Sequence, residues 1–449
     1  MNKLKNYKNW NNKNKIVVVN FLNSIIIKGF SVFLSFLTVP LYLKYFKDKT
    51  LIGLWLTLIS VTSWIFSFDL GFNHGLKNFL TIAFEKKEND KIKKILSSSY
   101  LIISSISFIL FLIFISVSYI VKFNDIFNIP SNIVDAYILK KILFILIVGF
   151  LINFVLKISD TILFSIQKHF IRNLLNLIAS LLLVIFLFLF KPTNTQNSLI
   201  IISIVYALSI NIPYLITIFV LYITVLKNSL PSFKDFDKNS SIKIFNLGLK
   251  FFIIQLIYTI LITTNEYLIS FFISPEKVFE YQIYYKPFFL VSSIFVLALS
   301  PIWSTVTKAQ TENDFKWIYN LFKRLKKISF FLLLFYLIML FFFQFIVNIW
   351  LNKNTFKVNY FYSFSMIIFN YIFIFNGILS SIANGLSDLK VQLYSYLFGV
   401  VLKFVIIIIF IRIFNSWMTI VWANILGLLI YTIIQPIYFN KKYFSKLGG

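Results

Sequence analysis

The sequence contains no cysteine and only two histidines, His74 and His169. The absence of cysteine excludes disulfide bonds, thiolate chemistry and cysteine-based metal sites, and two histidines argue against a zinc site. The chain also lacks a GxxxxGK[ST] phosphate loop, a GxSxG motif, an HExxH motif and an acidic cluster suited to magnesium. We therefore expect no bound metal, no organic cofactor and no enzymatic activity.

Charged residues are also scarce. They form 13% of the 449 residues, whereas soluble domains contain about 25%. Hydrophobic residues form 59%, and the mean hydropathy is +0.84. A membrane-spanning helix needs about 20 mostly apolar residues, and the apolar runs here lack the alternation of barrel strands. The predicted fold is an all-α polytopic membrane protein with twelve spans, centred on residues 17–43, 51–76, 95–121, 142–166, 174–190, 199–226, 245–272, 281–307, 328–350, 358–384, 391–411 and 417–438.

The net charge of +27 follows the predicted topology. If the loops are numbered alternately from the N-terminus, the N-terminal side of the membrane holds more than twice as many Lys and Arg residues as the other side. This bias is the positive-inside pattern, and it predicts that both termini are cytoplasmic. We attribute the charge to topology and to attraction by anionic membrane lipids, not to nucleic-acid binding.

The loop over residues 227–244 divides the spans into two groups of six. It contains Pro231, Ser232, Asp235 and Asp237, which suit a linker. The predicted organisation is an N-terminal six-helix lobe over 1–226, a cytoplasmic linker over 227–244 and a C-terminal six-helix lobe over 245–449. Two parallel lobes of this kind enclose a central cavity in transport folds.

Five lysines lie inside the predicted spans: Lys28, Lys157, Lys250, Lys286 and Lys403. An ionised side chain at the bilayer centre costs about 2.5–3.5 kcal/mol on insertion scales, so such residues face a protein interior or a wet cavity. Lys157 has local partners in Asn153 and Asp160, which favours a structural role. Lys250 lies near the inner surface, where it either snorkels or faces the cavity. We predict a cationic lumen, formed by Lys28, Lys286, Lys403 and Lys250, that handles an anion.

Three titratable side chains are candidates for ion coupling or gating: Asp69, Glu266 and His74. Asp69 is either a proton or sodium site or a fixed partner of Lys28. Glu266 lies at a depth similar to that of Lys286, so the two can form an ion pair that is structural or that opens when a competing anion arrives. His74, near the inner end of its span, either titrates or forms an interfacial hydrogen bond.

Four segments resemble parts of one transporter family, the O-antigen flippases or Wzx-type polysaccharide exporters. The first leads from GLWLTL to FDLGFNHGLKN, and the others occur in matching order near the eighth span and after the tenth. With twelve spans, the similarity covers nearly the whole chain. The segments are GLWLTL (53–58) with FDLGFNHGLKN (68–78), EYQIYYK (280–286), PIWSTVTKA (301–309) and NGLSDLKVQ (384–392).

The resemblance implies membership of the multidrug/oligosaccharidyl-lipid/polysaccharide exporter superfamily, with two six-helix lobes around a V-shaped cavity. It implies a multi-pass protein of the bacterial inner membrane that takes part in O-antigen, lipopolysaccharide or related surface-polysaccharide synthesis. The implied substrate is an undecaprenyl-diphosphate-linked oligosaccharide, flipped by alternating access with H⁺ or Na⁺ as coupling ion. Membrane lipids and the polysaccharide polymerase machinery are the implied partners. Asp69 and Lys286 fall within the matching segments.

Two alternatives remain. A cation-coupled multidrug exporter of the same superfamily would have similar spans, but its substrates are usually cationic, which a lysine-lined lumen disfavours. A membrane-embedded polysaccharide polymerase would be an enzyme. Such enzymes usually carry a large charged periplasmic loop, whereas the longest outside loop here, residues 122–141, contains no arginine.

Overall fold

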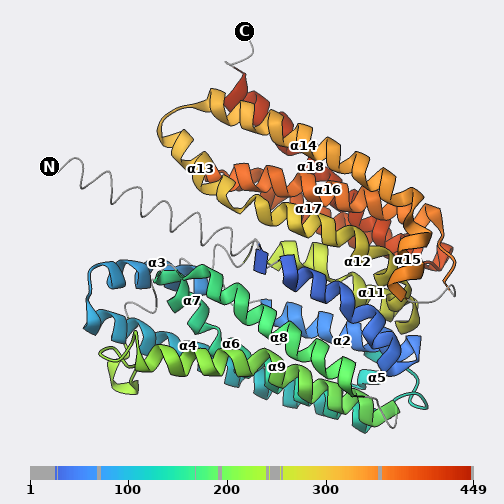
Figure 1. Cartoon of the computed structure of the whole chain (residues 1–449), viewed down its shortest axis with the longest axis horizontal. Helices are drawn as coiled ribbons and strands as arrows, with labels where there is room; N and C mark the ends of the chain where they lie inside the picture. Colours follow the sequence, from blue (N-terminus) through green and yellow to red (C-terminus); the bar gives the residue numbers. More distant parts are fainter. Residues whose placement is uncertain are drawn as a thin grey trace. The chain divides into compact units, whose positions relative to one another are not determined.

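The computed structural model describes residues 26–27, 29–67, 72–166, 168–190, 195–238, 242, 253, 256–351 and 356–445. Most of these residues are helical, and none of them lies in a strand (Figure 1). Within these ranges eight helices are long and apolar enough to cross a membrane, or nine if one bent pair counts as a single span. The predicted all-α polytopic membrane class is confirmed.

One compact unit contains Met1–Ser35, Ile65–Asn124 and Pro130–Ile253. Its apolar core forms where α3, α4, α7 and α9 meet, and it includes Leu76, Leu96, Ile158 and Tyr214. The elements are α3 (Phe72–Glu85), α4 (Asn89–Ile120), α6 (Ala136–Leu156), α7 (Ile158–Ser165), α8 (His169–Leu189), α9 (Thr195–Ile223) and the 3₁₀ helix η1 (Phe233–Asp235); the short α5 (Phe123–Ile126) lies at the boundary of the unit.

Polar side chains hold α6 against α9 in this unit. Asn211 donates its amide to the Gly149 carbonyl oxygen at 2.8 Å, and Asn153 donates to the Ile210 carbonyl at 2.7 Å. A Cβ atom at Gly149 would lie only 2.6 Å from that of Ala207, so glycine permits this close approach. Such amide bonds between spans satisfy polar groups that lipid cannot.

The predicted local partners of Lys157 have other contacts. Lys157 lies at the turn between α6 and α7. The buried Asp160 carboxylate accepts hydrogen bonds from Arg172 Nε at 3.1 Å and from the Tyr214 hydroxyl at 3.4 Å. Neutralisation of Lys157 within its own helix therefore stays a prediction.

The other compact unit contains Phe36–Trp64, Asp125–Ile129 and Ile254–Gly449. Residues 36–64 thus group with the later helices, so a division into lobes at 1–226, 227–244 and 245–449 stays a prediction. The elements are most of Gly29–Phe46 and of α2 (Lys49–Ser67), a helical stretch over 256–263, α11 (Asn265–Phe272), α12 (Pro275–Ala298), α13 (Ser300–Thr311), α14 (Phe315–Phe341), α15 (Phe343–Leu351), α16 (Tyr360–Gly385), α17 (Lys390–Phe414), α18 (Met418–Phe439) and the π-helix η2 (Asn440–Phe444).

Within this second unit α17 and α18 are in backbone contact. A Cβ atom at Gly399 would lie 2.5 Å from the Gly427 carbonyl oxygen, and one at Gly427 would lie 2.7 Å from that of Gly399. One turn away the rings of Tyr396 and Tyr431 pack with their centroids 4.8 Å apart. Small residues therefore allow these two helices to pack at minimal separation.

Asp388, in the loop between α16 and α17, fixes the end of the second unit. One of its oxygens, Oδ2, accepts hydrogen bonds from Lys442 Nζ at 2.6 Å and from the hydroxyls of Tyr438 and Tyr443, each at 2.8 Å. Burial pushes the pKa of this carboxyl upward, but the bonds from Lys442, Tyr443 and Tyr438 outweigh it. The pKa of Asp388 therefore lies below its ordinary value.

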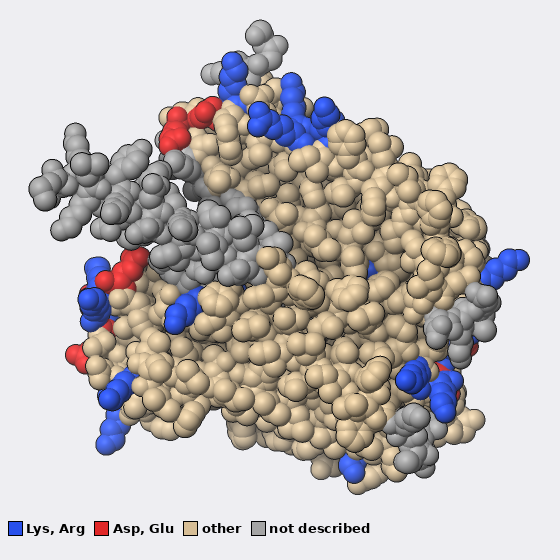
Figure 2. Space-filling model, viewed as in Figure 1, with Lys and Arg blue, Asp and Glu red and all other residues tan. Residues whose placement is uncertain are grey.

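On the face drawn in Figure 2, the visible Lys, Arg, Asp and Glu side chains lie mostly at the margins, and the area between them is covered by other residues. Many large apolar side chains are exposed along the helix sides, for example Phe108, Phe219 and Ile408. A water-soluble protein would bury them, whereas a span must present such a surface to lipid.

A buried lysine and a carboxylate form the candidate site

The candidate site lies in the second unit, at an interruption in the helix before α11. Residues 256–263 are helical, Thr264 is not, and α11 begins at Asn265. The Thr264 hydroxyl donates back to the Ile260 carbonyl at 2.7 Å, and the Thr264 carbonyl accepts from Leu268 N at 3.0 Å. An interrupted helix leaves carbonyl groups that need other donors.

Lys403 of α17 supplies those donors. Its ammonium donates to the Leu261 carbonyl at 2.8 Å, to Thr264 Oγ1 at 3.0 Å and to Asn265 Oδ1 at 2.9 Å. An ammonium has three protons, so each has an acceptor. The charge also lies at the C-terminal end of a helical stretch, where the helix dipole favours a cation.

Lys403 is 0% exposed, so its contacts in this structure are with protein groups. Asn424 of α18 donates to Asn265 Oδ1 at 3.3 Å and extends the network to a third helix. This geometry supports a structural role for Lys403. The predicted contact of Lys403 with a substrate in the lumen stays a prediction.

Glu266, the second residue of α11, has a hydrogen-bond donor at each carboxylate oxygen. Gln282 Nε2 donates to Oε1 at 2.9 Å, and Ser60 Oγ lies 3.2 Å from Oε2. The carboxylate is half-buried and is near enough to attract the ammonium groups of both Lys286 and Lys403. The predicted coupling candidate therefore interacts electrostatically with one half-buried lysine, Lys286, and one fully buried lysine, Lys403.

Lys286 lies one helical turn after Gln282 on α12, so the two side chains share a face. Its ammonium donates to Thr38 Oγ1 at 3.1 Å, and the side chain is half-buried rather than enclosed. A direct ion pair between Lys286 and Glu266 stays a prediction, because the contacts that define the carboxylate are those from Gln282 and Ser60.

The structure does not describe the side chains of the remaining predicted site residues. Lys28, Asp69 and Lys250 lie outside the described residues, and of His74 only its position on α3 is described. In the ranges that the structure covers, no three His, Asp or Glu side chains lie close enough together to hold a metal ion. Among the described residues, the charged groups that these contacts bring into the site are Lys286, Glu266 and Lys403.

Several members of the site carried no usable signal in the sequence. Thr38 and Ser60 are single hydroxyl residues within apolar runs. Each forms a hydrogen bond with a charged residue of the site that lies more than 200 positions later in the sequence. Asn265 and Asn424 are likewise single amides. The signal that the sequence does carry is the turn-by-turn spacing of polar residues, which places Gln282 with Lys286 on one helix face and Glu266 and Lys403 on two others.

Helices with lipid-facing sides and a buried charged site define a polytopic membrane protein. No family model matches the sequence, and no curated protein matches it. Among solved structures, the fold is similar to an inward-facing multidrug resistance MATE family transporter of the MOP superfamily, with a TM-score of 0.75 and 14% identity over 93% of this chain and 96% of that one.

Two further structures share this fold. The lipid II flippase MurJ in an inward closed conformation has a TM-score of 0.71 and 17% identity, over 96% of this chain and 90% of that chain. A MATE protein in complex with MaL6 has a TM-score of 0.64 and 14% identity, over 96% and 97%. At these identities the comparison establishes the fold, which is that of MATE transporters and of a lipid flippase.

Proposed function

We propose that the protein flips an undecaprenyl-diphosphate-linked oligosaccharide across the bacterial inner membrane by alternating access. The observation that carries the proposal is the charge of the site: two ammonium groups, Lys286 and Lys403, accompany one carboxylate, Glu266, inside a transporter fold. An excess of positive charge among apolar helices is costly unless an anion offsets it. A lipid-linked diphosphate is such an anion, and one of the similar folds is that of a lipid II flippase.

The two lysines have different roles in this proposal. Lys286 is half-buried and donates to the neutral Thr38 hydroxyl, and an incoming phosphate would be a stronger, charged acceptor for its ammonium. Lys403 donates hydrogen bonds to the interrupted helix before α11, and its charge adds to the positive potential at Lys286. Lysine acts as a point charge, which suits attraction and release better than bidentate clamping. Lys28 and Lys250 are proposed as further lumen cations.

Glu266 is proposed as the coupling group, with Asp69 and His74 as further candidates. When Glu266 is ionised, it partly offsets the two ammonium groups. When it binds H⁺ or Na⁺, the positive potential at Lys286 rises and the affinity for an anion rises with it. Ion binding and substrate binding would thereby support each other, as linkage requires.

The test is transport of a labelled undecaprenyl-diphosphate-linked oligosaccharide in proteoliposomes with an imposed proton or sodium gradient. A charge-assisted hydrogen bond contributes about 1.5–3 kcal/mol, so Lys286→Met should lower the transport rate by about tenfold or more. Lys277→Gln is the matched control on the same helix, because Lys277 is exposed and pairs with Glu280 at 2.6 Å. Glu266→Gln should transport without responding to the gradient.

Normal transport by Lys286→Met would refute the lumen role. The second candidate function is multidrug export, which the MATE folds and the carboxylate of Glu266 favour. It would replace the first if the proteoliposomes carry a cationic dye and leave the lipid-linked oligosaccharide in place, and if Glu266→Gln abolishes that dye transport.

A further inference from the structure

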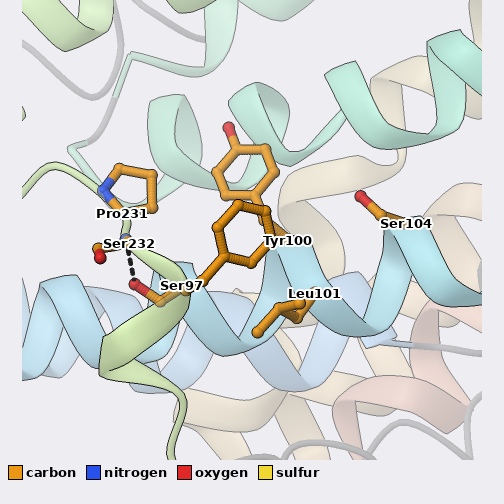
Figure 3. Close-up of a pocket in the computed structure, with 7 residues that line it drawn as sticks. Ser97, Tyr100, Leu101, Ser104, Pro231 and Ser232 are labelled. Atoms are coloured by element: carbon orange, nitrogen blue, oxygen red, sulfur yellow. Dashed lines mark hydrogen bonds between the residues drawn. The ribbon is translucent and has the colours of Figure 1, made fainter.

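The segment that follows α9 is fixed to α4 within the first unit. Ser97 Oγ accepts a hydrogen bond from Ser232 N at 2.9 Å (Figure 3). Ser98 Oγ accepts one from Asp237 N at 2.8 Å. Lys93 pairs with Asp235 at 2.9 Å. Three side chains on two successive turns of α4 thus bind residues 230–238, here named the linker segment.

The contact with α4 indicates how deep in the membrane the linker segment lies. The first six residues of α4, Asn89–Lys94, are almost all charged or polar, and the apolar part runs from Ile95 to Ile120. At 1.5 Å per residue this apolar part is about 39 Å long, close to the thickness of a bilayer including its interfacial layers. Ser97 lies at the start of that part, so the linker segment crosses α4 at the level of the lipid headgroups.

The linker segment presents apolar side chains outward. Phe233 is 84% exposed, and Leu230 and Phe236 are each 47% exposed. Such exposure is unfavourable in water, but an aromatic ring at the membrane interface is favourable. Beside Phe233 lies a cavity of about 310 Å³, lined also by Tyr100, Leu101 and Ser104 (Figure 3). Its rings and hydroxyls suit a molecule with an apolar and a polar part.

The charge around this surface is positive. Lys227, Lys234 and Lys238 are exposed on or beside the linker segment. Asp235 is paired with Lys93, which leaves Asp237 as the other carboxylate of the segment. Lysines at the headgroup level attract anionic lipids.

We propose that the linker segment and the α4 face beneath it bind an anionic phospholipid. Its acyl chain would enter the cavity beside Phe233 and Leu101, and its phosphate would lie among Lys227, Lys234 and Lys238. The bound lipid would anchor the linker segment to the membrane surface. This site is separate from the candidate transport site, and the proposal stands whatever substrate is transported.

The test compares hydrogen exchange of residues 230–238 in the full-length protein, in nanodiscs of phosphatidylcholine alone and with phosphatidylglycerol added. Phosphatidylglycerol should slow exchange in this segment by about fivefold or more. The triple variant Lys227→Gln, Lys234→Gln, Lys238→Gln should lose this difference, and Phe233→Ser should reduce it. The matched control neutralises Lys122, Lys140 and Lys141, which lie beyond the C-terminal end of α4 and near the start of α6.

Equal exchange in the two lipid compositions would overturn the proposal. Slower exchange that persists in the linker triple variant, or that disappears equally in the control triple variant, would also overturn it, because the effect would then be general surface attraction. The surface positions of the substitutions leave the packed core intact, and a symmetric peak in size-exclusion chromatography verifies folding.

Discussion

Replacement of Lys403 by methionine is the sharpest test of the interruption before α11. Methionine has a similar length and fits an apolar interior, but it removes all three hydrogen bonds of the ammonium. Asn265 Oδ1 keeps the donor from Asn424. The Leu261 carbonyl and Thr264 Oγ1 lose the donor that Lys403 supplied.

The expected cost follows from those two acceptors. A buried acceptor left without a partner costs about 1–3 kcal/mol, so two acceptors bound the loss at about 2–6 kcal/mol. Hydrogen bonds between spans contribute less on average, about 0.6 kcal/mol, which places the expected loss at the lower end, about 2–3 kcal/mol. The insertion cost of lysine does not offset this loss, because it applies to the chain in the membrane whether or not the helices are packed.

Reversible unfolding in mixed micelles of detergent and sodium dodecyl sulfate measures this loss as a shift of the midpoint. Lys403→Arg keeps the cation and several donors, so it should lose less than Lys403→Met. Lys286→Met makes the same substitution at a half-buried site and should lose under about 1 kcal/mol. The contrast between the two methionine variants separates the structural lysine from the accessible one.

The reasoning fails if Lys403→Met unfolds at the wild-type midpoint, or if Lys286→Met is destabilised as much. The first result would mean that the Leu261 carbonyl needs no donor. The second would mean that every lysine within a span stabilises the fold equally, and that accessibility does not distinguish their roles.

Two further predictions concern packing and pH. Gly53→Ala should prevent folding, because its Cβ would lie 1.6 Å from the Pro275 carbonyl oxygen. The control is Gly29→Ala, whose Cβ would meet nothing within 4 Å. The yield of monodisperse protein in size-exclusion chromatography measures the effect of both substitutions. The pKa of Asp388 is lower in the folded state than in the unfolded state. Its contribution to the free energy of unfolding is therefore fully present above the unfolded-state pKa of about 3.9, and it is lost as the pH falls through the lower pKa of the folded state. Melting temperatures between pH 7 and pH 3 should therefore decrease more for the wild type than for Asp388→Asn, and equal decreases would contradict this.

The presence of the spans could be predicted from the sequence because length and hydropathy alone decide whether a helix can cross lipid. The predicted cores at 95–121, 358–384 and 391–411 agree with α4, α16 and α17 to within a few residues at most ends. The predicted core at 328–350 lies within α14 and α15, and α14 begins earlier, at Phe315, because its first half carries several charged residues that precede the apolar part.

The interruptions could not be predicted. Proline is the usual signal for a break, yet Pro213, Pro287 and Pro436 lie inside helices that continue. The interruption at Thr264 has no such signal. It is stabilised by Lys403, 139 residues later in the chain, so only the folded structure shows why it exists.

The candidate site was predictable where chemistry repeats along one helix. Gln282 and Lys286 share a face of α12, and Glu266 lies at a similar depth. The assignment of Lys403 to the lumen rested on its central position in a span and on the helix face that it shares with Ser395 and Gly399. Neither feature can distinguish a cavity from an interruption in a neighbouring helix. A water-filled cavity and an interrupted neighbouring helix both supply hydrogen-bond acceptors to a buried lysine. The sequence does not show which of the two supplies them.

The contact between Gly399 and Gly427 has a practical consequence for the study of motion. Two helices with touching backbones cannot slide or separate without losing that contact, so α17 and α18 should move as one body. Because the chain has no cysteine, spin labels can be introduced singly or in pairs without removing native thiols. The distance between one label on α17 and one on α18 should stay constant during turnover. It would serve as an internal reference for label distances that change elsewhere in the protein.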